Sequence, residues 1–451
     1  MRTHSYFFKR AGTATGIAAA LWLFFSGFAR AEAPLPRGGT VHPAPTETSP
    51  VRTLASATLA ATGDVLMHGA VKDAAADHRA QAGDEGYAWL YAPISDLLGA
   101  SDLTFANLET PVAPHSGTGS KAFVFNAPPS AVRALRDAGV GAMSVANNHA
   151  FDQGRAGFVE TMTEVERAGV IPVGGGQAPD EPGPRVLERN GLRIALFGWA
   201  HFFNQDGNDC PPREPRCVKA AQLDRERAVA LVREAAPRFD AVVVSVHWGD
   251  EYASQPRAED VALARRLCDA GAIAVIGHHP HVLQPIEIYR RADGKSAVIA
   301  YSLGNFISNQ SRNYVQGVTP AKVAATRDGA LLRFTIARRD YGRGVQEVEL
   351  AGVEYWPLWT ENDTAERRTP GVRPKIRVVS LHRALDAVRT ELAALPDPVA
   401  PADRARYEQL RRREELYVAR RRAIAEVLGE DLEGTPPPAP PSAPAATSTA
   451  R

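Results

Sequence analysis

The sequence of 451 residues predicts an α/β fold, because short apolar runs alternate along it with stretches of helical periodicity. The runs expected to be strands are residues 58–66, 103–108, 141–146, 194–199, 241–246, 273–276 and 297–301. In the stretches between them, apolar residues recur at spacings of three and four, as on one face of a helix. These expected helices are residues 130–138, 158–168, 224–235 and 258–270.

A second observation supports the α/β class and points to a site. Five of the expected strands end abruptly in polar side chains that can bind metals or transfer protons. In α/β sheets, ligands bind outside the carboxyl ends of strands, and a packed core gives no reason for five strands to end in this way. We therefore expect these side chains to converge. They are Asp64, Glu109, Asn147, Asn148, His149, His247, His278, His279 and His281.

The first 31 residues predict a signal peptide. Arg2, Lys9 and Arg10 form a basic start, an apolar run covers residues 11–28, and Ala-Arg-Ala at 29–31 is a small-residue cleavage site. The alternative is an uncleaved membrane anchor, but the run is near the lower limit of the roughly 17–25 residues that a membrane span needs. We therefore expect a periplasmic or extracellular protein.

The mature chain is expected to begin with a linker and continue into one large domain. Residues 32–53 are rich in Pro, Gly, Thr and Ser, which disfavour regular structure. The main domain is expected over residues 54–310 and a β-rich completion of it over 311–382. The strand-like segments of this completion are residues 330–337, 345–353 and 375–381.

The carboxyl-terminal part is expected to be helical and then disordered. Charged helices are predicted within residues 383–432, at 383–394 and 402–428, and the second is dense in Arg and Glu at helical spacing. Such patterning favours a solvated surface helix over a docking helix. Residues 433–451, rich in Pro, Ala, Ser and Thr, predict a disordered tail.

Charge and cysteine content narrow the classes of function. The 52 basic and 51 acidic residues nearly cancel, so no electrostatic argument supports nucleic acid as a partner. Cys210 and Cys217 flank a Pro-rich segment and, in an exported chain, predict a disulfide. Cys268 lies in a helical pattern and is expected to be a buried, inert thiol.

The converging side chains suit a divalent metal. Carboxylate, amide and imidazole ligands together favour ions such as Mn, Zn or Fe. Two ions roughly 3.5–4 Å apart can clamp the attacking and leaving oxygens of a displacement. A phosphoester or related ester is therefore the expected substrate class.

Six motifs in a fixed order resemble those of the CapA-type capsule-synthesis (poly-γ-glutamate) proteins of the calcineurin-like metallophosphatase superfamily. The resemblance covers about residues 55–310. The motifs are Thr-Gly-Asp-Val at 62–65, Asn-Leu-Glu at 107–109, Ala-Asn-Asn-His at 146–149 with Asp152, His-Trp-Gly-Asp-Glu-Tyr at 247–252, Gly-His-His-Pro-His-Val-Leu-Gln at 277–284 and Ser-Leu-Gly-Asn-Phe at 302–306.

The resemblance implies a four-layer α/β/β/α sandwich with metal between two β-sheets. It also implies envelope-polymer chemistry, with an anionic or amide-linked polymer or a phosphoester as substrate and capsule-synthesis membrane proteins as partners. For the site, it implies that Asp64 and His281 bind a first metal, that Asn148, His247 and His279 bind a second, and that Glu109 bridges them. His149 would be the acid–base residue. Apart from the resemblance, Asp152 and Glu251 are expected to orient histidines rather than to bind metal.

Two departures from the superfamily pattern affect the first metal position. Metallophosphatases have Asp-x-His at their first motif, whereas Leu66 occupies the place of that His and cannot bind metal. His68 compensates only if the chain turns back. The bridging Asp is replaced by the longer Glu109. One or two ions per chain are therefore expected, with the first position the weaker.

Other functions and structural roles stay open. The chain could be a general periplasmic metallophosphatase, or a non-catalytic polymer-binding protein that keeps the site as structure. Asp64 could merely cap a turn. His278 is expected to be a satisfied loop histidine rather than a ligand. Trp248 and Tyr252 are expected in the core, at the rim, or as an aromatic wall beside a polymer.

Overall fold

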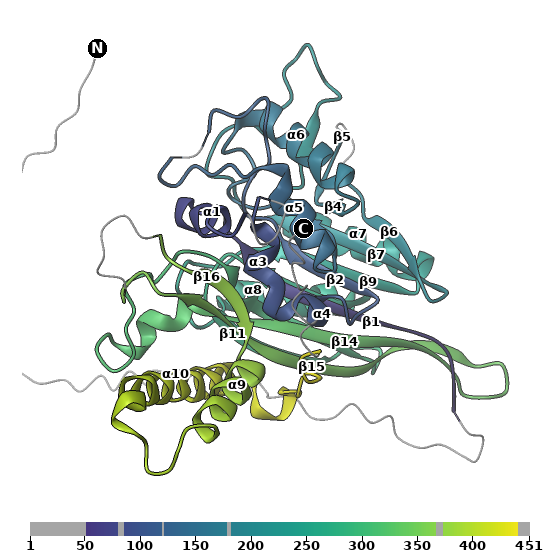
Figure 1. Cartoon of the computed structure of the whole chain (residues 1–451). Helices are drawn as coiled ribbons and strands as arrows, with labels where there is room; N and C mark the ends of the chain where they lie inside the picture. Colours follow the sequence, from purple (N-terminus) through teal and green to yellow (C-terminus); the bar gives the residue numbers. More distant parts are fainter. Residues whose placement is uncertain (1–50, 80–84, 120, 178–181, 367–372, 441–451) are drawn as a thin grey trace, which may run out of the picture. The chain divides into compact units, whose positions relative to one another are not determined.

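The computed structural model describes residues 51–440 except 80–84, 120, 178–181 and 367–372 (Figure 1). The expected signal peptide and nearly all of the expected linker lie outside the described residues, as does the end of the tail from residue 441. Within the described ranges, no helix is both long enough and apolar enough to cross a membrane.

The first sheet contains eight strands in the order β16-β15-β14-β1-β2-β3-β4, with β13 also paired to β1. β1 to β4 run parallel, whereas β14, β15 and β16 extend the sheet in antiparallel fashion from β1. The strands are β1 (Arg52–Val65), β2 (Leu103–Asn107), β3 (Val140–Ser144), β4 (Ile171–Val173), β13 (Asn305–Ile307), β14 (Asp328–Asp340), β15 (Gln346–Asn362) and β16 (Ile376–Ser380).

The second sheet contains six strands in the order β11-β12-β10-β9-β7-β6. Its four central strands are parallel and its two edges are antiparallel. The strands are β6 (Arg185–Arg189), β7 (Leu192–Ala200), β9 (Ala241–His247), β10 (Ala272–His278), β11 (Leu283–Arg290) and β12 (Ser296–Leu303), and a separate pair is formed by β5 (Gly175–Gln177) and β8 (Val218–Ala220).

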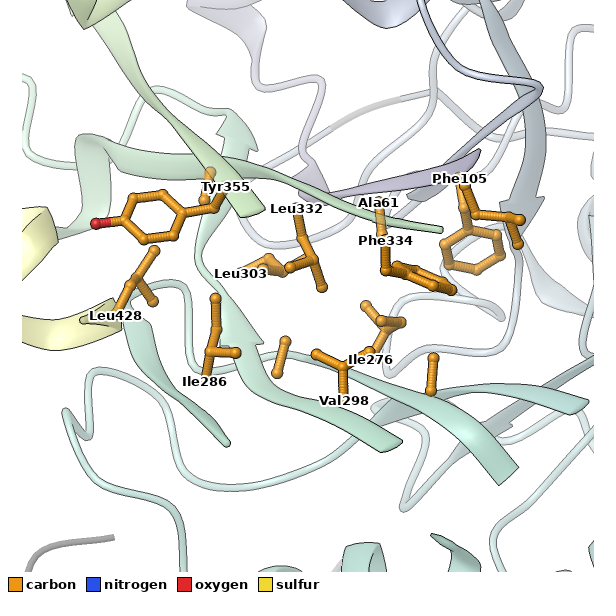
Figure 2. Packing of buried hydrophobic residues seen from close by; sticks show 14 of the residues in the cluster. Ala61, Phe105, Ile276, Ile286, Val298, Leu303, Leu332, Phe334, Tyr355 and Leu428 are labelled. Atoms are coloured by element: carbon orange, nitrogen blue, oxygen red, sulfur yellow. The ribbon is translucent and has the colours of Figure 1, made fainter. Parts of the chain in front are cut away.

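An apolar core fills the space between the two sheets. On β1, Ala57, Leu59 and Ala61 belong to this core, while Ala60 belongs to the cluster beneath the helices, as the two-residue period of a strand requires. Figure 2 shows Leu332 of β14 on the side of the first sheet and Val298 of β12 on the side of the second.

Helices cover the outer face of each sheet, which completes the expected four-layer α/β/β/α sandwich. α5 and α6 pack with the first sheet, in the core cluster that also holds the apolar side chains of α1 and α3. α8 packs on β10 and β12 of the second sheet, beside α7. The helices are α1 (Gly69–Ala76), α3 (Tyr87–Tyr91), α4 (Ser95–Leu98), α5 (Pro129–Asp137), α6 (Gly154–Arg167), α7 (Arg225–Ala235) and α8 (Ala258–Asp269).

The last two helices pack against the sandwich instead of lying free on its surface. α9 (Leu381–Ala393) and α10 (Arg404–Leu428) lie side by side, and α10 contacts β11, β14 and β15 (Figure 1). Leu410, Tyr417 and Ile424 of α10 are buried in the inter-sheet core. The expectation of a solvated helix was wrong for this face, because a seven-residue apolar spacing is hidden among the charges.

The beginning of the expected disordered tail is also packed. The Gly434 backbone N–H donates to the Tyr355 carbonyl oxygen at 2.9 Å, and Glu433 lies 2.8 Å from His382 Nε2. The Arg383 guanidinium donates to the Pro437 carbonyl at 2.9 Å. Glu433, Gly434 and Pro437 therefore differ from the prediction, because backbone and side-chain groups of β15 and α9 bind them.

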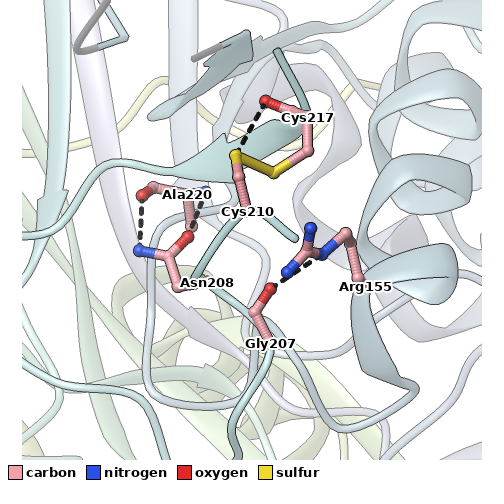
Figure 3. Close-up of a disulfide and its surroundings, with 6 residues drawn as sticks. All are labelled: Arg155, Gly207, Asn208, Cys210, Cys217 and Ala220. Carbon is pink, nitrogen blue, oxygen red and sulfur yellow. Dashed lines mark hydrogen bonds between the residues drawn. A yellow bond between two sulfur atoms is a disulfide. The ribbon is translucent and has the colours of Figure 1, made fainter. Parts of the chain in front are cut away.

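The predicted disulfide between Cys210 and Cys217 is present (Figure 3). Next to it, Asn208 binds the backbone of Ala220 through both of its side-chain atoms, at 2.9 and 3.1 Å. Cys268 on α8 is free and buried, as expected. The loop between β7 and β8 is thus held by covalent and polar contacts.

Candidate metal centre

The carboxyl ends of strands from both sheets meet at one place. Asp64 lies near the end of β1, Glu109 follows β2 by two residues, and His247 ends β9. His279 and His281 follow β10, which is the neighbour of β9. Ligand atoms of these five residues fall into overlapping groups in which all atoms lie within 4.8 Å of one another.

Two glycines allow this convergence. A Cβ atom added to Gly63 would lie 1.9 Å from the carbonyl oxygen of Gly304, and one added to Gly277 would lie 1.9 Å from the carbonyl oxygen of Tyr301. Any side chain at these positions would push the strand ends apart. The glycines of two motifs are therefore required for close backbone approach.

The first group consists of Asp64, Glu109 and His281, all of which are buried. His281 places Nδ1 3.2 Å from Asp64 Oδ2 and Nε2 3.7 Å from Glu109 Oε1. Burial alone would raise the pKa of Asp64, but the neighbouring rings of His278 and His281 lower it well below its usual range. Asp64 is therefore an anionic ligand candidate.

The second group consists of Glu109, His247 and His279. His247 Nε2 lies 3.6 Å from Glu109 Oε1 and 3.0 Å from Asn148 Oδ1, so Asn148 lies at the same centre. Burial, and then repulsion from His279, lowers the pKa of His247 well below its usual range. A neutral imidazole offers the lone pair that a metal requires.

A third group joins Glu251 to His279 and His281. Glu251 is the exposed member, whereas both histidines are buried. We expect Glu251 to orient a histidine, but its carboxylate lies close enough to these two rings for all three side chains to bind one ion. Glu251 therefore marks the solvent side of the centre.

Glu109 Oε1 provides a test of whether these residues fit a metal. This atom is buried and has no hydrogen-bond partner within the described residues, and the same is true of His279 Nδ1. Burial, and then repulsion from Asp64, raises the pKa of Glu109 well above its usual range. Unpaired buried groups of this kind are costly, and a divalent cation satisfies both. The donor set fits Zn, Mn or Fe.

Asn107, the first residue of the second motif, lies at the middle of the cluster, although the sequence predicts no role for it. Its Nδ2 is 2.9 Å from Asp64 Oδ1, 3.3 Å from His247 Nδ1 and 3.4 Å from Glu109 Oε2. Asn107 therefore contacts members of both ligand groups, and the other ring nitrogen of His247 faces Glu109 and Asn148. The only sequence signal was an amide at the end of an apolar strand.

His278 differs from its predicted place. It is the last residue of β10 and fully buried, rather than a loop residue, and its Nδ1 lies 3.3 Å from Asp64 Oδ1. The strand continues two residues beyond the apolar run that was used to place it. Neither ring nitrogen of His278 has a hydrogen-bond partner within the described residues, so the prediction of a satisfied histidine was also wrong.

His149 and Asp152 form a pair beside the cluster. His149 Nδ1 lies 2.8 Å from Asp152 Oδ2, which also accepts a hydrogen bond from the Phe125 backbone N–H at 2.6 Å. The Phe125 ring lies 4.6 Å from the His149 ring. The geometry places Asp152 where it orients His149, and the catalytic role of both stays a prediction.

His68 does not supply the imidazole that is missing because position 66 is a leucine. His68 belongs to none of the ligand groups in the described part of the chain. Its Nδ1 accepts a hydrogen bond from the Asn309 N–H at 3.3 Å, and its ring packs edge-on against Phe125. Burial lowers the pKa of His68 to about 4. It is a neutral wall residue, and the first group keeps a single histidine.

The loop that carries the histidines is held in an unusual backbone conformation. His279 has φ of 101° and His281 has φ of 58°, values that non-glycine residues rarely adopt. Such residues persist where the surrounding structure constrains them, often at binding sites. The loop is therefore shaped to present two imidazoles to one point.

The two aromatic residues of the fourth motif have different positions. Trp248 is buried and donates from Nε1 to the Tyr301 carbonyl at 3.0 Å. Tyr252 is 55% exposed, and its ring centroid lies 6.2 Å from that of His281. Trp248 is thus a core residue, and Tyr252 forms the rim of the centre.

Fold and site together define an α/β/β/α sandwich protein with a candidate metal centre at the strand ends. The model of one family, described as "Bacterial capsule synthesis protein PGA_cap", matches residues 58–310, which is more than half of the chain. The chain belongs to this bacterial capsule synthesis protein family.

Two relatives carry capsule-related names. The PGA biosynthesis protein CapA of Bacillus subtilis (strain 168) is 31% identical over 303 residues, which cover 66% of this chain and 73% of that protein. The capsule biosynthesis protein CapA of Bacillus anthracis is 29% identical over 297 residues, covering 64% and 66%. The Thermus thermophilus sulfate thiohydrolase SoxB shows only a distant likeness, with 15% identity and a TM-score of 0.32 over 78% of this chain and 47% of that one.

Proposed function

We propose that this protein acts in the synthesis of a capsule or poly-γ-glutamate-type envelope polymer and carries a metal-dependent hydrolase or transferase centre. The observation that carries the proposal is the position of Glu109, which belongs to two groups of candidate ligands at once. One carboxylate shared by two groups is the arrangement that a bridged pair of ions requires.

The proposed roles of the residues follow from their positions. Asn148, His247 and His279 would hold one ion and Asp64 with His281 the other, with Glu109 between them. When bound, the metal would supply Lewis acidity toward a phosphoryl or acyl oxygen. His149, with its Nδ1 held by Asp152, would accept or return a proton at Nε2. Glu251 and Tyr252 would contact the substrate at the open side.

We further propose that the protein works outside the cytoplasm, as its amino-terminal sequence predicts. The proposed substrate is an anionic or amide-linked polymer, or a phosphoester formed during its assembly. Membrane proteins of capsule synthesis are proposed partners. Identification of the mature amino terminus by mass spectrometry tests the export proposal. Cleavage after residue 31 would leave Glu32 as the first residue.

A second function, polymer binding without catalysis, is favoured by one observation. Leu66 is buried where the superfamily has an imidazole, and His68 does not replace that imidazole. The first position therefore has few ligands. A protein of this kind would keep one ion as a structural element and bind the polymer at the same edge.

Turnover of bis(p-nitrophenyl) phosphate with and without added Mn²⁺ separates these functions. Glu109→Gln keeps the shape of the side chain and removes its charge, so metal-dependent turnover should disappear. Glu160→Gln is the matched control, because Glu160 lies at the surface, where it accepts hydrogen bonds from Ser116 and from the His115 backbone. Wild-type protein that holds metal but hydrolyses no phosphoester under any metal condition would refute the catalytic proposal and support polymer binding.

A further inference from the structure

A groove of about 600 Å³ opens beside the metal centre and leads to the carboxyl-terminal helix. Tyr252 and Val282 line its near end, and Ala423 and Val427 of α10 line its far end. Its volume lies within the range of roughly 300–1,000 Å³ that is typical of ligand sites. The groove is distinct from the ligand cluster, because none of the candidate metal ligands lines it.

The groove is continuous with the centre. Val282 directly follows His281 in the chain, and the Tyr252 ring lies next to the His281 ring. Gln310, another lining residue, donates to the Tyr252 hydroxyl at 3.4 Å. A molecule that reacts at the centre and extends past Tyr252 therefore enters this groove.

The lining is largely apolar and includes two charged side chains, Lys322 and Asp328. Lys322 lies at the groove and has no ion-pair partner within the described residues. The carboxylate of Asp328 also lines the groove, but it is neutralised by two hydrogen bonds from Arg420 of α10. An unpaired cation above aliphatic walls favours a chain with apolar segments and a carboxylate.

We propose that this groove is the subsite for the continuation of the substrate, a carboxylate-bearing amide-linked chain whose charge pairs with Lys322 and whose aliphatic part packs on α10. This inference rests on the proposed function, since it deepens the substrate class of the same centre. It assigns to α10 a role in binding long substrates: the helix contributes the far wall of the groove.

Binding of γ-linked glutamate oligomers to the full mature chain tests the groove. Isothermal titration calorimetry should give a γ-linked octamer at least about ten-fold higher affinity than a γ-linked dimer, because only the octamer reaches the far wall. Ala423→Phe narrows this wall and should remove the advantage of the octamer while leaving dimer binding unchanged. Val418→Phe is the matched control, because Val418 is exposed on the same helix and does not line the groove.

Lys322→Glu tests the electrostatic part of the proposal. Charge reversal should weaken octamer binding about five-fold at low salt and have less effect at 0.5 M salt, because salt screens exposed charges. Lys375→Glu, at an exposed lysine outside the groove, should have no effect. The proposal would be overturned if the octamer bound Ala423→Phe and Lys322→Glu as tightly as it binds the wild type. It would also be overturned if the wild type bound the octamer no more tightly than the dimer.

The two proposals fail in different ways. Both groove variants should keep wild-type hydrolysis of a small phosphoester, because that substrate does not extend past Tyr252. Loss of octamer binding with normal small-substrate turnover supports the groove. Normal octamer binding by the variants, with metal-dependent turnover intact, contradicts the groove alone. Absence of metal-dependent turnover in the wild type contradicts the catalytic function, and the difference between octamer and dimer then still decides the groove.

Discussion

Asp152 holds His149 in one orientation, with Oδ2 of the carboxylate 2.8 Å from Nδ1 of the ring. The same oxygen accepts the Phe125 backbone N–H, so the carboxylate is itself fixed in place. A carboxylate on Nδ1 favours the tautomer in which Nε2 carries a lone pair. His149 is therefore prepared to exchange a proton at Nε2.

The first prediction concerns this pair. His149→Ala should lower turnover by on the order of 10²–10⁴, the usual range for loss of an acid–base group, and should keep the metal content. Asp152→Asn should lower turnover less, because the ring remains. Steady-state kinetics with parallel metal analysis provides the measurement. Unchanged turnover in His149→Ala at full metal occupancy would refute the role, and lost metal would make His149 a ligand.

A second prediction concerns Gly63, whose Cα lies against the backbone of the loop after β12. Gly63→Ala should destabilise the protein by at least about 2 kcal/mol, since the added Cβ would meet backbone atoms of Leu303 and Gly304, which cannot turn away as a side chain can. Gly352→Ala is the control, because a Cβ there meets no atom within 4 Å. Urea unfolding of both variants gives the comparison. Equal midpoints would show that β1 and this loop are less closely packed than described.

The third prediction concerns the buried pair of Arg420 and Asp328. Arg420→Met leaves a buried carboxylate without its partner and should cost roughly 3–5 kcal/mol at pH 7.5. Arg422→Met, at an exposed pair with Glu426 on the same helix, should cost less than about 1 kcal/mol. Denaturant unfolding of each variant measures the cost.

The cost of Arg420→Met should also depend on pH. Burial raises the pKa of Asp328 from 3.8 to about 6 even beside Arg420. A carboxyl group with a raised pKa binds protons more readily in the folded state, so its effect on stability becomes more unfavourable as pH rises through that window. Without Arg420, the carboxyl should be neutral at pH 5, and the deficit should be smaller there than at pH 7.5. An equal deficit at both pH values would contradict this.

A fourth prediction concerns the number of reactive thiols in the protein. Cys210 and Cys217 are paired, and burial raises the pKa of Cys268, so native unreduced protein should react with no thiol reagent. Unfolding without reductant should expose one thiol. Three thiols after unfolding would show that the disulfide is absent from the purified protein.

Much of the fold could be predicted because two periodicities are local properties of the sequence. Apolar runs identified the central strands of both sheets, and spacings of three and four identified α5 to α8. The order of strands within each sheet could not be predicted, since it depends on contacts between distant segments. α10 was placed as a helix, but the charged residues around Leu410, Tyr417 and Ile424 obscured the apolar face that packs on the sheets.

The candidate site shows the same division. Residues at strand ends could be grouped because parallel strands end at one edge. The central position of Asn107 could not be foreseen, because it depends on contacts with Asp64 and His247, which other strands bring close. Glu251 was placed near the site by its motif, but its proximity to His279 and His281 depends on the path of an irregular loop. His278 was misplaced because β10 extends beyond its apolar run.

Metal content per chain, measured on purified wild type, His247→Ala and Asp64→Ala, tests the central claim most directly. The second metal position has four donors, as a tightly bound ion requires: Asn148, His247, His279 and Glu109. The first position has only Asp64 and His281 of its own and shares Glu109 with the second. We predict about one tightly held ion per chain, lost in His247→Ala and retained in Asp64→Ala. Added Mn²⁺ or Zn²⁺ should raise wild-type activity but not that of Asp64→Ala. Two equally tight ions, or one that survives His247→Ala and is lost in Asp64→Ala, would contradict the account.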